Sequence, residues 1–372
     1  MEIGVPKEIK PQEARVGLTP AGVRELVARG HVVQVESGAG IGAGLLDEDY
    51  VHAGARIAES PEAVFASADI VVKVKEPQPS EYDLLRHGQI LYTYLHLAPD
   101  PKLTQALQAS GCTAIAYETI TDHSGALPLL APMSEVAGRL SVQAGAACLE
   151  RINGGSGTLL GGVPGVQSAS TVIIGGGVVG TNAMQMAIGL NAHVTLLGKS
   201  LTRLREIDAH YGGRVQTLYS NVENLEASVR DADLVIGAVL IPGASAPRLV
   251  SRRMIQAMRP GSAVVDVAID QGGCFETSHA TTHADPRFRV DGVVHYCVSN
   301  MPGAVPRTAT HALTNATLPY LLRLADLGFR DAMRGDSNLA NGLNIHAGEI
   351  THPEVARSMV ADHHPVKEAI GA

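Results

Sequence analysis

The chain has 372 residues, enough for two domains that each bury a hydrophobic core. Hydrophobic residues make up 45% of the chain and charged residues 18%, a balance that excludes an intrinsically disordered protein. The net charge of −8 and the lack of tryptophan argue against a nucleic-acid partner, because phosphate contacts need basic side chains and base stacking needs aromatic ones.

The sequence shows no targeting signal. It opens without a basic leader followed by an apolar run, so we expect no signal peptide. No apolar stretch reaches the ~18 residues that a membrane-spanning helix needs, and we expect a cytoplasmic protein with no membrane partner. The cysteines are widely spaced and form no CxxC pair, which favours reduced thiols in the hydrophobic core. They are Cys112, Cys148, Cys274 and Cys297.

Strands and helices alternate in the first third of the chain. Residues 2–5 are predicted to form a strand, and residues 20–29 a helix with Thr19 as its N-cap and Pro20 at its first position. Further strands are predicted at residues 31–36, 68–74, 89–95 and 113–117. This alternation is typical of a mostly parallel sheet covered by helices.

Pro128 and Pro132 interrupt this alternation, and a second series follows. A long alanine-rich helix is predicted at residues 134–151, capped by Ser134, and a glycine-rich loop at 153–165. From Thr171 onward the predicted strands are 172–174, 193–197, 214–218, 234–238, 263–267 and 293–298. Six strands in this rhythm form a complete doubly wound sheet, inserted in the middle of the chain.

The residues after about Pro306 have no place in a complete sheet. We expect them to return to the first domain as helices, for example at 312–327. The predicted fold is therefore α/β with two doubly wound domains. A substrate domain is formed by both chain ends, 1–128 and 306–372, and a Rossmann nucleotide-binding domain by 129–305. The tail histidines are irregularly spaced, which favours solvated surface residues over a metal site; they are His346, His352, His363 and His364.

Three spaced glycines follow the strand that begins at Thr171. Gly175 permits a tight turn, Gly177 lets the backbone approach a pyrophosphate, and Gly180 lets the next helix pack closely on the strand. The helix N-terminus then faces the negative charge. With a strand before it and a helix after it, this motif predicts a dinucleotide site.

The acidic residue that usually accompanies this motif is missing. About 20 residues after the first glycine, an Asp or Glu normally binds the ribose 2′-hydroxyl of NAD. The sequence has Gly198 there, followed by Lys199 and Ser200. Without the carboxylate, these residues and Arg203 could hydrogen-bond a 2′-phosphate. We hypothesise that the chain accepts NADP(H), alone or alongside NAD(H); the alternative is that Lys199 and Arg203 are ordinary solvated residues.

Other strand ends of the same domain should border the cofactor, because ligands bind outside the carboxyl ends of parallel strands. These further cofactor candidates are Ser220, Val239, Leu240, Val267, Ala268, Ile269, Asp270, Val298 and Met301.

Two titratable residues follow apolar strands and suit proton transfer. His96 follows the strand at 89–95, and Asp270 follows the strand at 263–267. A histidine that titrates near neutral pH can take a proton while hydride leaves a carbon that carries an amine or hydroxyl. The structural alternative for His96 is a half-buried histidine with satisfied hydrogen bonds.

Two cations in the first domain suit a carboxylate substrate. The Arg15 guanidinium can bind a carboxylate through two hydrogen bonds, and the Lys75 ammonium can polarise a carbonyl. Each alone could be a surface charge, but Lys75 stands at the carboxyl end of a strand.

Taken together, the sequence resembles the L-alanine dehydrogenase family along nearly its whole length. The resemblance is carried by long motifs, which are Ile3-Gly-Val-Pro-Lys-Glu8, Arg15-Val16, Lys73-Val-Lys-Glu-Pro77, Tyr94-Leu-His-Leu97, Ala131-Pro-Met-Ser-Glu-Val-Ala-Gly138, Gly161-Gly-Val-Pro-Gly165, Ala268-Ile-Asp-Gln-Gly-Gly273 and Asn300-Met-Pro302. The resemblance implies reversible oxidative deamination of L-alanine to pyruvate and ammonia with a nicotinamide cofactor, NAD and/or NADP, in a homohexamer.

The resemblance also implies residue roles. Arg15 holds the substrate carboxylate, Lys75 its carbonyl or amino end, and His96 and Asp270 serve the acid–base steps around the imine and its hydration. The residues implied to shape the substrate pocket are Tyr94, Met133 and Asn300. Those implied to line the nucleotide are Ser134, Gly177, Val178, Leu240, Ala268, Ile269 and Met301.

The chain departs from the family pattern in two places. Gly198 replaces the family's ribose-binding acid, which puts strict NAD specificity in doubt; a natural variant and an engineered cofactor switch both fit. Arg323 and Leu327 stand where some members have a Glu and a His linked to a metal ion, so we predict no metal.

Two other functions stay open at this point. One is the soluble NAD(H)-binding component of a proton-translocating transhydrogenase, which shares the opening motif and the inserted nucleotide domain. The other is a nucleotide-sensing module without catalysis. His96, Asp270 and the lack of a membrane span favour the dehydrogenase.

Overall fold

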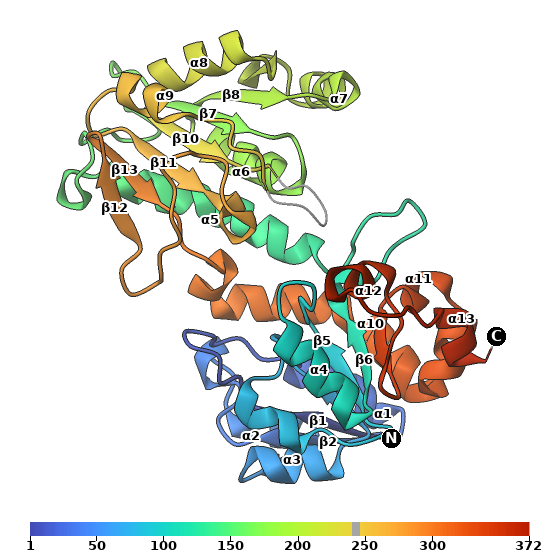
Figure 1. The fold of residues 1–372 in the computed structure, drawn as a ribbon. Coiled ribbons are helices and arrows are strands. Elements are labelled where there is room, and N and C mark those ends of the chain that lie inside the picture. Colours follow the sequence, from blue (N-terminus) through green and yellow to red (C-terminus); the bar gives the residue numbers. More distant parts are fainter. Residues whose placement is uncertain (240–245, 372) are drawn as a thin grey trace. The chain divides into compact units, whose positions relative to one another are not determined.

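The chain folds into two units, which Figure 1 shows in the colours of the sequence. Unit 1 consists of Met1–Met133 and Val305–Ala372, and unit 2 of Ser134–Ala304. The structure is a computed structural model that describes residues 1–239 and 246–371. The predicted cofactor residue Leu240 therefore lies outside the described residues.

Unit 1 is built on an eight-stranded sheet with the order β15-β14-β6-β5-β4-β1-β2-β3. Its strands are β1 (Glu2–Val5), β2 (Val32–Glu36), β3 (Arg56–Ala58), β4 (Ile70–Val72), β5 (Ile90–Thr93), β6 (Thr113–Ala116), β14 (Leu343–His346) and β15 (Glu349–Ile350). The first six run parallel, while β14 is antiparallel to β6 and β15. The five strands predicted in the first third are present. Every residue of β4, β5 and β6 is buried, as in a parallel sheet covered on both faces.

The helices of unit 1 begin at recognisable caps. In α1 (Pro20–Ala28), the Thr19 side chain accepts a hydrogen bond from the Gly22 N–H, so the predicted N-cap is confirmed. The other α-helices are α2 (Asp47–His52), α3 (Pro61–Ser67), α4 (Pro101–Ser110), α10 (Pro306–Arg334), α11 (Ser337–Ala340), α12 (Pro353–Met359) and α13 (Val366–Ile370). The short 3-10 segments are η1 (Ile41–Ala43), η2 (Pro79–Leu84) and η3 (Tyr117–Thr119).

The C-terminal return differs from the prediction in two respects. The helix expected at 312–327 is the longer α10, which starts at Pro306, where a missing N–H costs nothing, and contains a non-helical residue at Gly328 (φ 74°). The strands β14 and β15 were not predicted. Each has four residues or fewer, too short to show a period.

Unit 2 is built on a seven-stranded sheet with the order β12-β13-β11-β10-β7-β8-β9. Its strands are β7 (Ser170–Ile174), β8 (His193–Gly198), β9 (Val215–Tyr219), β10 (Leu234–Gly237), β11 (Ala263–Asp266), β12 (Arg287–Val290) and β13 (Val293–Tyr296). The six predicted strands are present. Read from β9 to β13, they follow the order third, second, first, fourth, fifth, sixth, which defines the dinucleotide-binding sheet.

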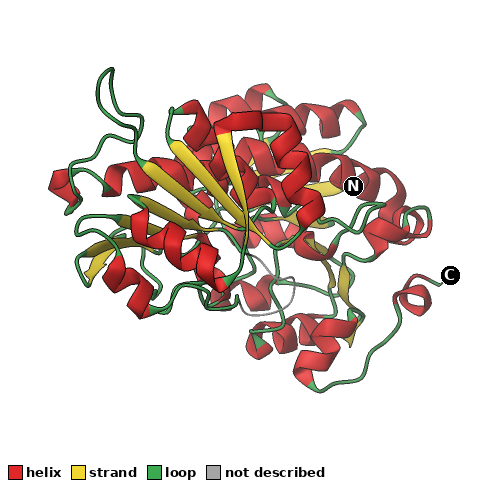
Figure 2. Cartoon of the chain, turned by 90° about the horizontal axis from the view of Figure 1, so that it is seen from above, coloured by secondary structure: helices red, strands yellow, loops and turns green. Residues whose placement is uncertain are grey.

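The strand β12 was not predicted, because its sequence Arg-Phe-Arg-Val lies at the sheet edge and no residue in it is fully buried. The α-helices of unit 2 are α6 (Val178–Gly189), α7 (Leu201–Tyr211), α8 (Val222–Asp231) and α9 (Arg252–Ala257), with 3-10 segments η4 (Arg151–Asn153), η5 (Gly212–Arg214) and η6 (Val267–Gln271). Figure 2 shows strands fanned in a sheet with helices beside them.

The helix α5 (Ala131–Cys148) starts three residues earlier than predicted. Pro132 lies in its first turn, where proline is tolerated, so this proline begins the helix rather than preceding it. Ser134 is therefore inside the helix, and its prediction as the N-cap is wrong.

The core of unit 2 covers both faces of its sheet. Ile173, Ile236 and Val265 pack into one buried cluster, and their strand neighbours Val172 and Val235 into another. Successive residues of a strand point to opposite faces, so continuous apolar strands need helices on both sides. The four cysteines are buried free thiols, and burial raises the pKa of Cys112 and Cys148 to about 11.

Candidate active site

Four neighbouring parallel strands of unit 1 end at one edge of the sheet, and polar residues follow three of them closely. Lys75 comes after β4, His96 after β5 and Glu118 after β6. Arg15 lies on the loop between β1 and α1, and Gly17 on the same loop stands so close to β4 that a Cβ there would be 2.8 Å from the Val72 carbonyl oxygen. The carboxyl ends of β1, β4, β5 and β6 thus bring these side chains together.

Arg15 is a buried guanidinium held by Glu13. Both oxygens of the Glu13 carboxylate accept from it, with Nε to Oε1 at 2.7 Å and Nη2 to Oε2 at 2.6 Å. Although burial favours the neutral acid, the hydrogen bonds and charge of Arg15 lower the pKa of Glu13 to about 2. Nη1 of Arg15 contacts the Met133 sulfur at 3.0 Å. The guanidinium is therefore fixed before any substrate arrives.

Lys75 is half-buried, and its backbone is held on both sides. Glu8 Oε1 accepts from the N–H groups of Val74 (2.6 Å) and Lys75 (3.3 Å), and the Thr93 hydroxyl donates to the Lys75 carbonyl (3.0 Å). Burial first, and then the charges of Arg15 and Lys10, lower the pKa of Lys75. A lysine in this state gives up a proton more readily than one on the surface.

The residue two positions before Lys75 is a buried lysine. Lys73 is fully buried, and its Nζ lies 3.2 Å from Glu8 Oε2 and 2.9 Å from Glu81 Oε1. Glu81 also accepts from the Gln78 N–H at 2.7 Å. This network ties the loop after β1 to the end of β4 and the start of η2, and it fixes the backbone from which Lys75 projects.

His96 lies in a left-handed backbone conformation with φ 50°, which few non-glycine residues adopt. Its side chain is 48% exposed, so it is not a buried core histidine. The ring stacks on Tyr94 with centroids 5.9 Å apart and planes 3° from parallel. Tyr94 is buried, and its hydroxyl donates to the Leu129 carbonyl at 2.5 Å. We call Arg15, Lys75, Tyr94, His96 and Met133 the strand-end cluster.

In unit 2, the glycine turn has the geometry that a nucleotide phosphate needs. Gly175 has φ 111°, and a Cβ on Gly180 would stand 1.8 Å from the Gly175 carbonyl oxygen, so no larger residue fits there. Gly177 is exposed at the N-cap of α6, and no heavy atom lies within 4 Å of where its Cβ would be. The backbone at the helix N-terminus is thus open to an anion.

Gly198, Lys199, Ser200 and Arg203 form what we call the ribose edge. Gly198 ends β8, and Lys199 and Ser200 are exposed, with Ser200 as the N-cap of α7. The Arg203 guanidinium donates to the Gly176 carbonyl (3.2 Å) and the Thr181 hydroxyl (3.1 Å) and pairs with Glu206 (2.8 Å). Arg203 therefore contacts the glycine turn directly.

Asp270 lies exposed on η6, next to the last strand. Both of its carboxylate oxygens accept from the Asn300 N–H at 3.3 Å, and Asn300 has φ 59°. Asp266 caps the same segment by accepting from the Ala268 N–H at 3.1 Å.

The other predicted cofactor residues of unit 2 follow its strands, except for Ser134, which lies in α5. Val298, Met301, Ala268 and Ile269 are buried. Val239, Val267, Ser220 and Ser134 are partly buried, and Val178 is exposed. The Ser220 N–H donates to the Gly198 carbonyl at 3.0 Å.

Three carboxylates that contact residues of the strand-end cluster were not predicted from the sequence: Glu8, Glu13 and Glu118. Glu118 follows β6 as His96 follows β5, so the strand-end rule that singled out His96 also points to Glu118. Glu13 lies two residues before Arg15 and Glu8 within the opening motif, and neither position signals what the carboxylate contacts.

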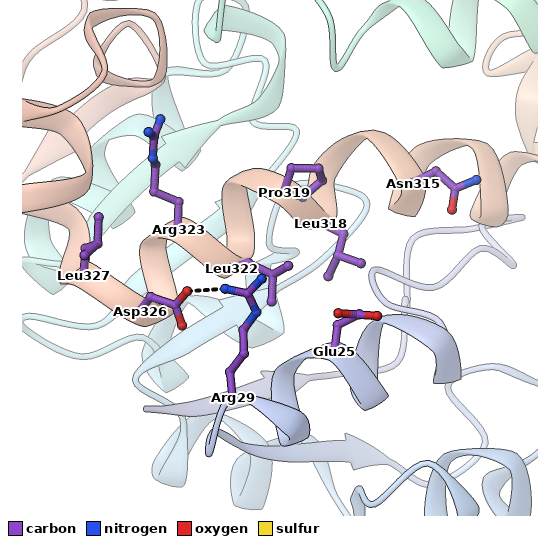
Figure 3. Close-up of a pocket in the computed structure, with 9 residues that line it drawn as sticks. All are labelled: Glu25, Arg29, Asn315, Leu318, Pro319, Leu322, Arg323, Asp326 and Leu327. Atoms are coloured by element: carbon purple, nitrogen blue, oxygen red, sulfur yellow. Dashed lines mark hydrogen bonds and ion pairs between the residues drawn. The ribbon is translucent and has the colours of Figure 1, made fainter.

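A cavity of about 650 Å³ lies in unit 1 between α1 and α10 (Figure 3). Arg323 and Leu327 line it, and Arg323 also pairs with Asp336. On its other side Arg29 pairs with Asp326 at 2.6 Å. None of the residues of the strand-end cluster lines this cavity.

The strand order and glycine turn make unit 2 a Rossmann-type dinucleotide-binding unit, and unit 1 adds a cluster suited to a small carboxylate. This combination defines a dinucleotide-dependent oxidoreductase. Two family models match the chain: the N-terminal domain of alanine dehydrogenase/PNT over residues 4–137 and its C-terminal domain over residues 141–353. The chain belongs to the alanine dehydrogenase/PNT family, which confirms the resemblance predicted from the motifs.

Relatives cover the whole chain. A Halomonas elongata protein named alanine dehydrogenase is 56% identical over 371 residues, 100% of both chains, and one from Methanococcus maripaludis is 52% identical over the same share. A solved L-alanine dehydrogenase structure is 55% identical with a TM-score of 0.94, covering 97% of this chain and 99% of its own. A Sinorhizobium meliloti transhydrogenase is 26% identical with a TM-score of 0.83, covering 95% and 99%. Among the described residues, no helix is long and apolar enough to cross a membrane.

Proposed function

We propose that this chain catalyses the reversible oxidative deamination of L-alanine to pyruvate and ammonia with a nicotinamide cofactor. The observation that carries the proposal is the 56% identity, over the full length of both chains, to a protein named alanine dehydrogenase. The transhydrogenase likeness, at 26% identity, is the more distant one.

In this proposal the two units bind different molecules, the substrate and the nucleotide. Residues 1–128 and 306–372 form the substrate domain, and residues 129–305 the nucleotide-binding domain. Arg15 binds the substrate carboxylate, because a guanidinium and a carboxylate are matched in charge and in planar geometry. Lys75 donates to the amino or carbonyl end of the substrate, and Tyr94 and Met133 border its methyl side chain. Asn300 is a further proposed substrate-binding residue.

The residues of unit 2 fit a dinucleotide. The open backbone at Gly177 and the N-terminus of α6 would hold the pyrophosphate, and the strand ends at Val239, Ala268 and Val298 would line the nucleotide. When bound, the oxidised nicotinamide supplies a hydride acceptor for the alanine Cα.

The protons are handled by His96 and Asp270. His96 takes a proton from the amino group of alanine as hydride leaves its Cα. Asp270 orients the water that adds to the resulting imine, and the adduct collapses to pyruvate and ammonium. The exposed imidazole and exposed carboxylate support these roles, because both side chains are reachable by a small substrate.

We further propose that the enzyme accepts NADP(H), alone or alongside NAD(H). Gly198 offers no carboxylate to repel a 2′-phosphate, and Lys199, Ser200 and Arg203 supply donors beside it. Direct titration of the protein with NADH and NADPH, followed by nicotinamide fluorescence, measures this preference. Strict NAD(H) binding would contradict the proposal.

The activity test is alanine-dependent formation of reduced nicotinamide, measured by its near-ultraviolet absorbance with NAD and with NADP. A dehydrogenase reduces at least one of them. A transhydrogenase component and a nucleotide sensor bind the cofactor but do not oxidise alanine. The proposed setting is a cytoplasmic homohexamer, and light scattering of the purified protein measures its assembly.

A further inference from the structure

We propose that Glu118 is the positioning residue for His96: it holds the histidine in its left-handed backbone conformation and places a negative charge beside the ring. This inference rests on the proposed function, in which His96 moves the proton. It concerns a residue with no role in the reaction as described above.

The backbone of His96 needs an external support. It has φ 50°, a conformation in which an L-residue brings its Cβ close to the following carbonyl oxygen. Such residues persist only where their surroundings over-determine them. The side chain is 48% exposed, so its own packing does not supply the support.

Glu118 supplies that support through the backbone. β5 and β6 are parallel, with Thr93 paired to Ala116, so the residues just past the two strand ends lie side by side. The Glu118 carboxylate accepts from the Leu95 N–H, at 3.1 and 3.2 Å to its two oxygens, and from the His96 N–H at 2.6 Å. Hydrogen bonds to a carboxylate are stronger than those to a neutral acceptor. Because the N–H groups of both Leu95 and His96 donate to Glu118, the backbone is held at both residues.

The same carboxylate lies next to the ring. Glu118 Oε1 is 3.8 Å from His96 Nδ1, too far for a hydrogen bond but close enough for an ion pair when the imidazole is protonated. The Glu118 side chain is only 15% exposed, so water screens this charge weakly. The Tyr94 ring stacks on the His96 ring. The charge of Glu118 also acts on the imidazole of His352, the residue before α12.

These contacts give Glu118 a testable effect on the reaction. Its hydrogen bonds fix the backbone of Leu95 and His96 and so orient the imidazole. Loss of the acceptor should lower kcat and free the two N–H groups, and a conservative acceptor at position 118 should restore much of both. A residue that only stabilised the fold would not show this restoration.

The experiment compares Glu118→Gln and Glu118→Ala in the full-length chain, with the exposed Glu349→Gln on β15 as the matched control. The amide of Gln keeps one oxygen acceptor for the N–H groups, and Ala removes it. Two quantities are measured for each: kcat and KM for alanine, and the rate of amide hydrogen exchange in the peptide that contains Leu95 and His96, read by mass spectrometry.

We expect kcat to fall about tenfold in Glu118→Gln and about a hundredfold in Glu118→Ala, the scale of a small misplacement of a catalytic group, with KM changed by less than about twofold. Exchange of the Leu95 and His96 amides should quicken in Glu118→Ala, stay closer to wild type in Glu118→Gln and be unchanged in Glu349→Gln. Unchanged kcat or unchanged exchange in folded Glu118→Ala overturns the proposal, and so does a Glu118→Gln variant that loses as much kcat as Glu118→Ala. The exchange measurement needs no turnover. If the wild-type chain does not oxidise alanine, the proposed function fails while the test of Glu118 still stands.

Discussion

The strand-end cluster of unit 1 and the ribose edge of unit 2 differ in how their residues are held in place. In the cluster, each residue proposed to touch substrate charge is fixed by a carboxylate: Arg15 by Glu13, Lys75 by Glu8 and His96 by Glu118. At the ribose edge, Lys199 and Ser200 are exposed, and the Arg203 guanidinium contacts side chains and a carbonyl near it. The residues proposed for the chemistry are thus held by carboxylates, whereas two of the residues proposed to choose the cofactor, Lys199 and Ser200, are exposed.

Unit 2 nevertheless contains one arrangement that is also found at the strand-end cluster. Asp270 accepts from the N–H of Asn300, which has φ 59°, just as Glu118 accepts from the N–H of His96, which has φ 50°. In each unit a carboxylate accepts from the N–H of a left-handed residue that lies shortly after a strand, His96 after β5 and Asn300 after β13. The comparison therefore sets the residues held by carboxylates in each unit apart from the ribose edge.

The largest predicted effect comes from removing the proton-transfer groups. His96→Ala and Asp270→Asn should each lower kcat at least ~100-fold, the scale of one general acid or base. Both side chains are exposed, so we expect the melting temperature to change little. Steady-state kinetics with alanine measures the effect. Near-full activity in either variant would remove that residue from the mechanism.

The next largest effect is predicted for Glu13→Gln. The neutral amide cannot neutralise Arg15, and breaking a buried ion pair by removing one partner costs on the order of 3–5 kcal/mol. The amide also offers Arg15 one oxygen acceptor in place of two, so the guanidinium is oriented less tightly and KM for alanine should rise at least ~10-fold. Urea unfolding and alanine titration measure the two effects. A variant with wild-type stability and KM shows that Glu13 does not hold Arg15.

The same pair gives a prediction for acid stability. Glu13 has an ordinary pKa of 4.5 that the folded protein lowers to about 2. Its contribution to the free energy of unfolding is therefore complete above the unfolded pKa and is lost as pH falls from about 4.5 toward about 2. Wild-type unfolding free energy should decline across this range more steeply than that of Glu13→Gln. Equal slopes for the two proteins would count against a lowered pKa.

Some strands and site residues could be predicted from the sequence, and others could not. The strands at 70–72, 90–93 and 172–174 were predictable because apolar β-branched runs between turn residues leave no other element. The edge strand β12 was not: Arg287 and Arg289 alternate with Phe288 and Val290, as in a half-exposed strand, but four residues are too few for this period to stand out. His96 and Asp270 were predictable because they follow such runs.

The carboxylates that hold the strand-end cluster were harder to predict. Glu118 is 22 residues from His96, and the pairing follows only from the register of β5 and β6. Glu13 is near Arg15 in sequence, but a two-residue separation does not say that both carboxylate oxygens meet one guanidinium. At the ribose edge, the missing carboxylate at Gly198 was visible at once, while the contact of Arg203 with Gly176 needed coordinates.

The smallest structural effect, and the sharpest test of the comparison, is predicted for Gly198→Asp. Gly198 has no positive φ, and a Cβ there would meet the end of the Leu204 side chain at 3.1 Å, a flexible neighbour that can move aside. Gly198 is buried at the end of β8, so we expect Gly198→Asp to change the unfolding free energy by about 1 kcal/mol, the centre of the range for point substitutions. The new carboxylate should accept from the ribose hydroxyl of NADH and repel the 2′-phosphate of NADPH.

The Kd for NADPH should therefore rise at least ~10-fold relative to that for NADH, since each ~1.4 kcal/mol of lost interaction is tenfold. Gly198→Ala is the matched control, because it adds the Cβ without the charge and should leave the ratio of the two Kd values near that of the wild type. If Gly198→Ala shifts the ratio as far as Gly198→Asp does, the shape of the β8 end rather than its charge selects the cofactor. The ribose edge would then act through its backbone geometry, as the strand-end cluster does.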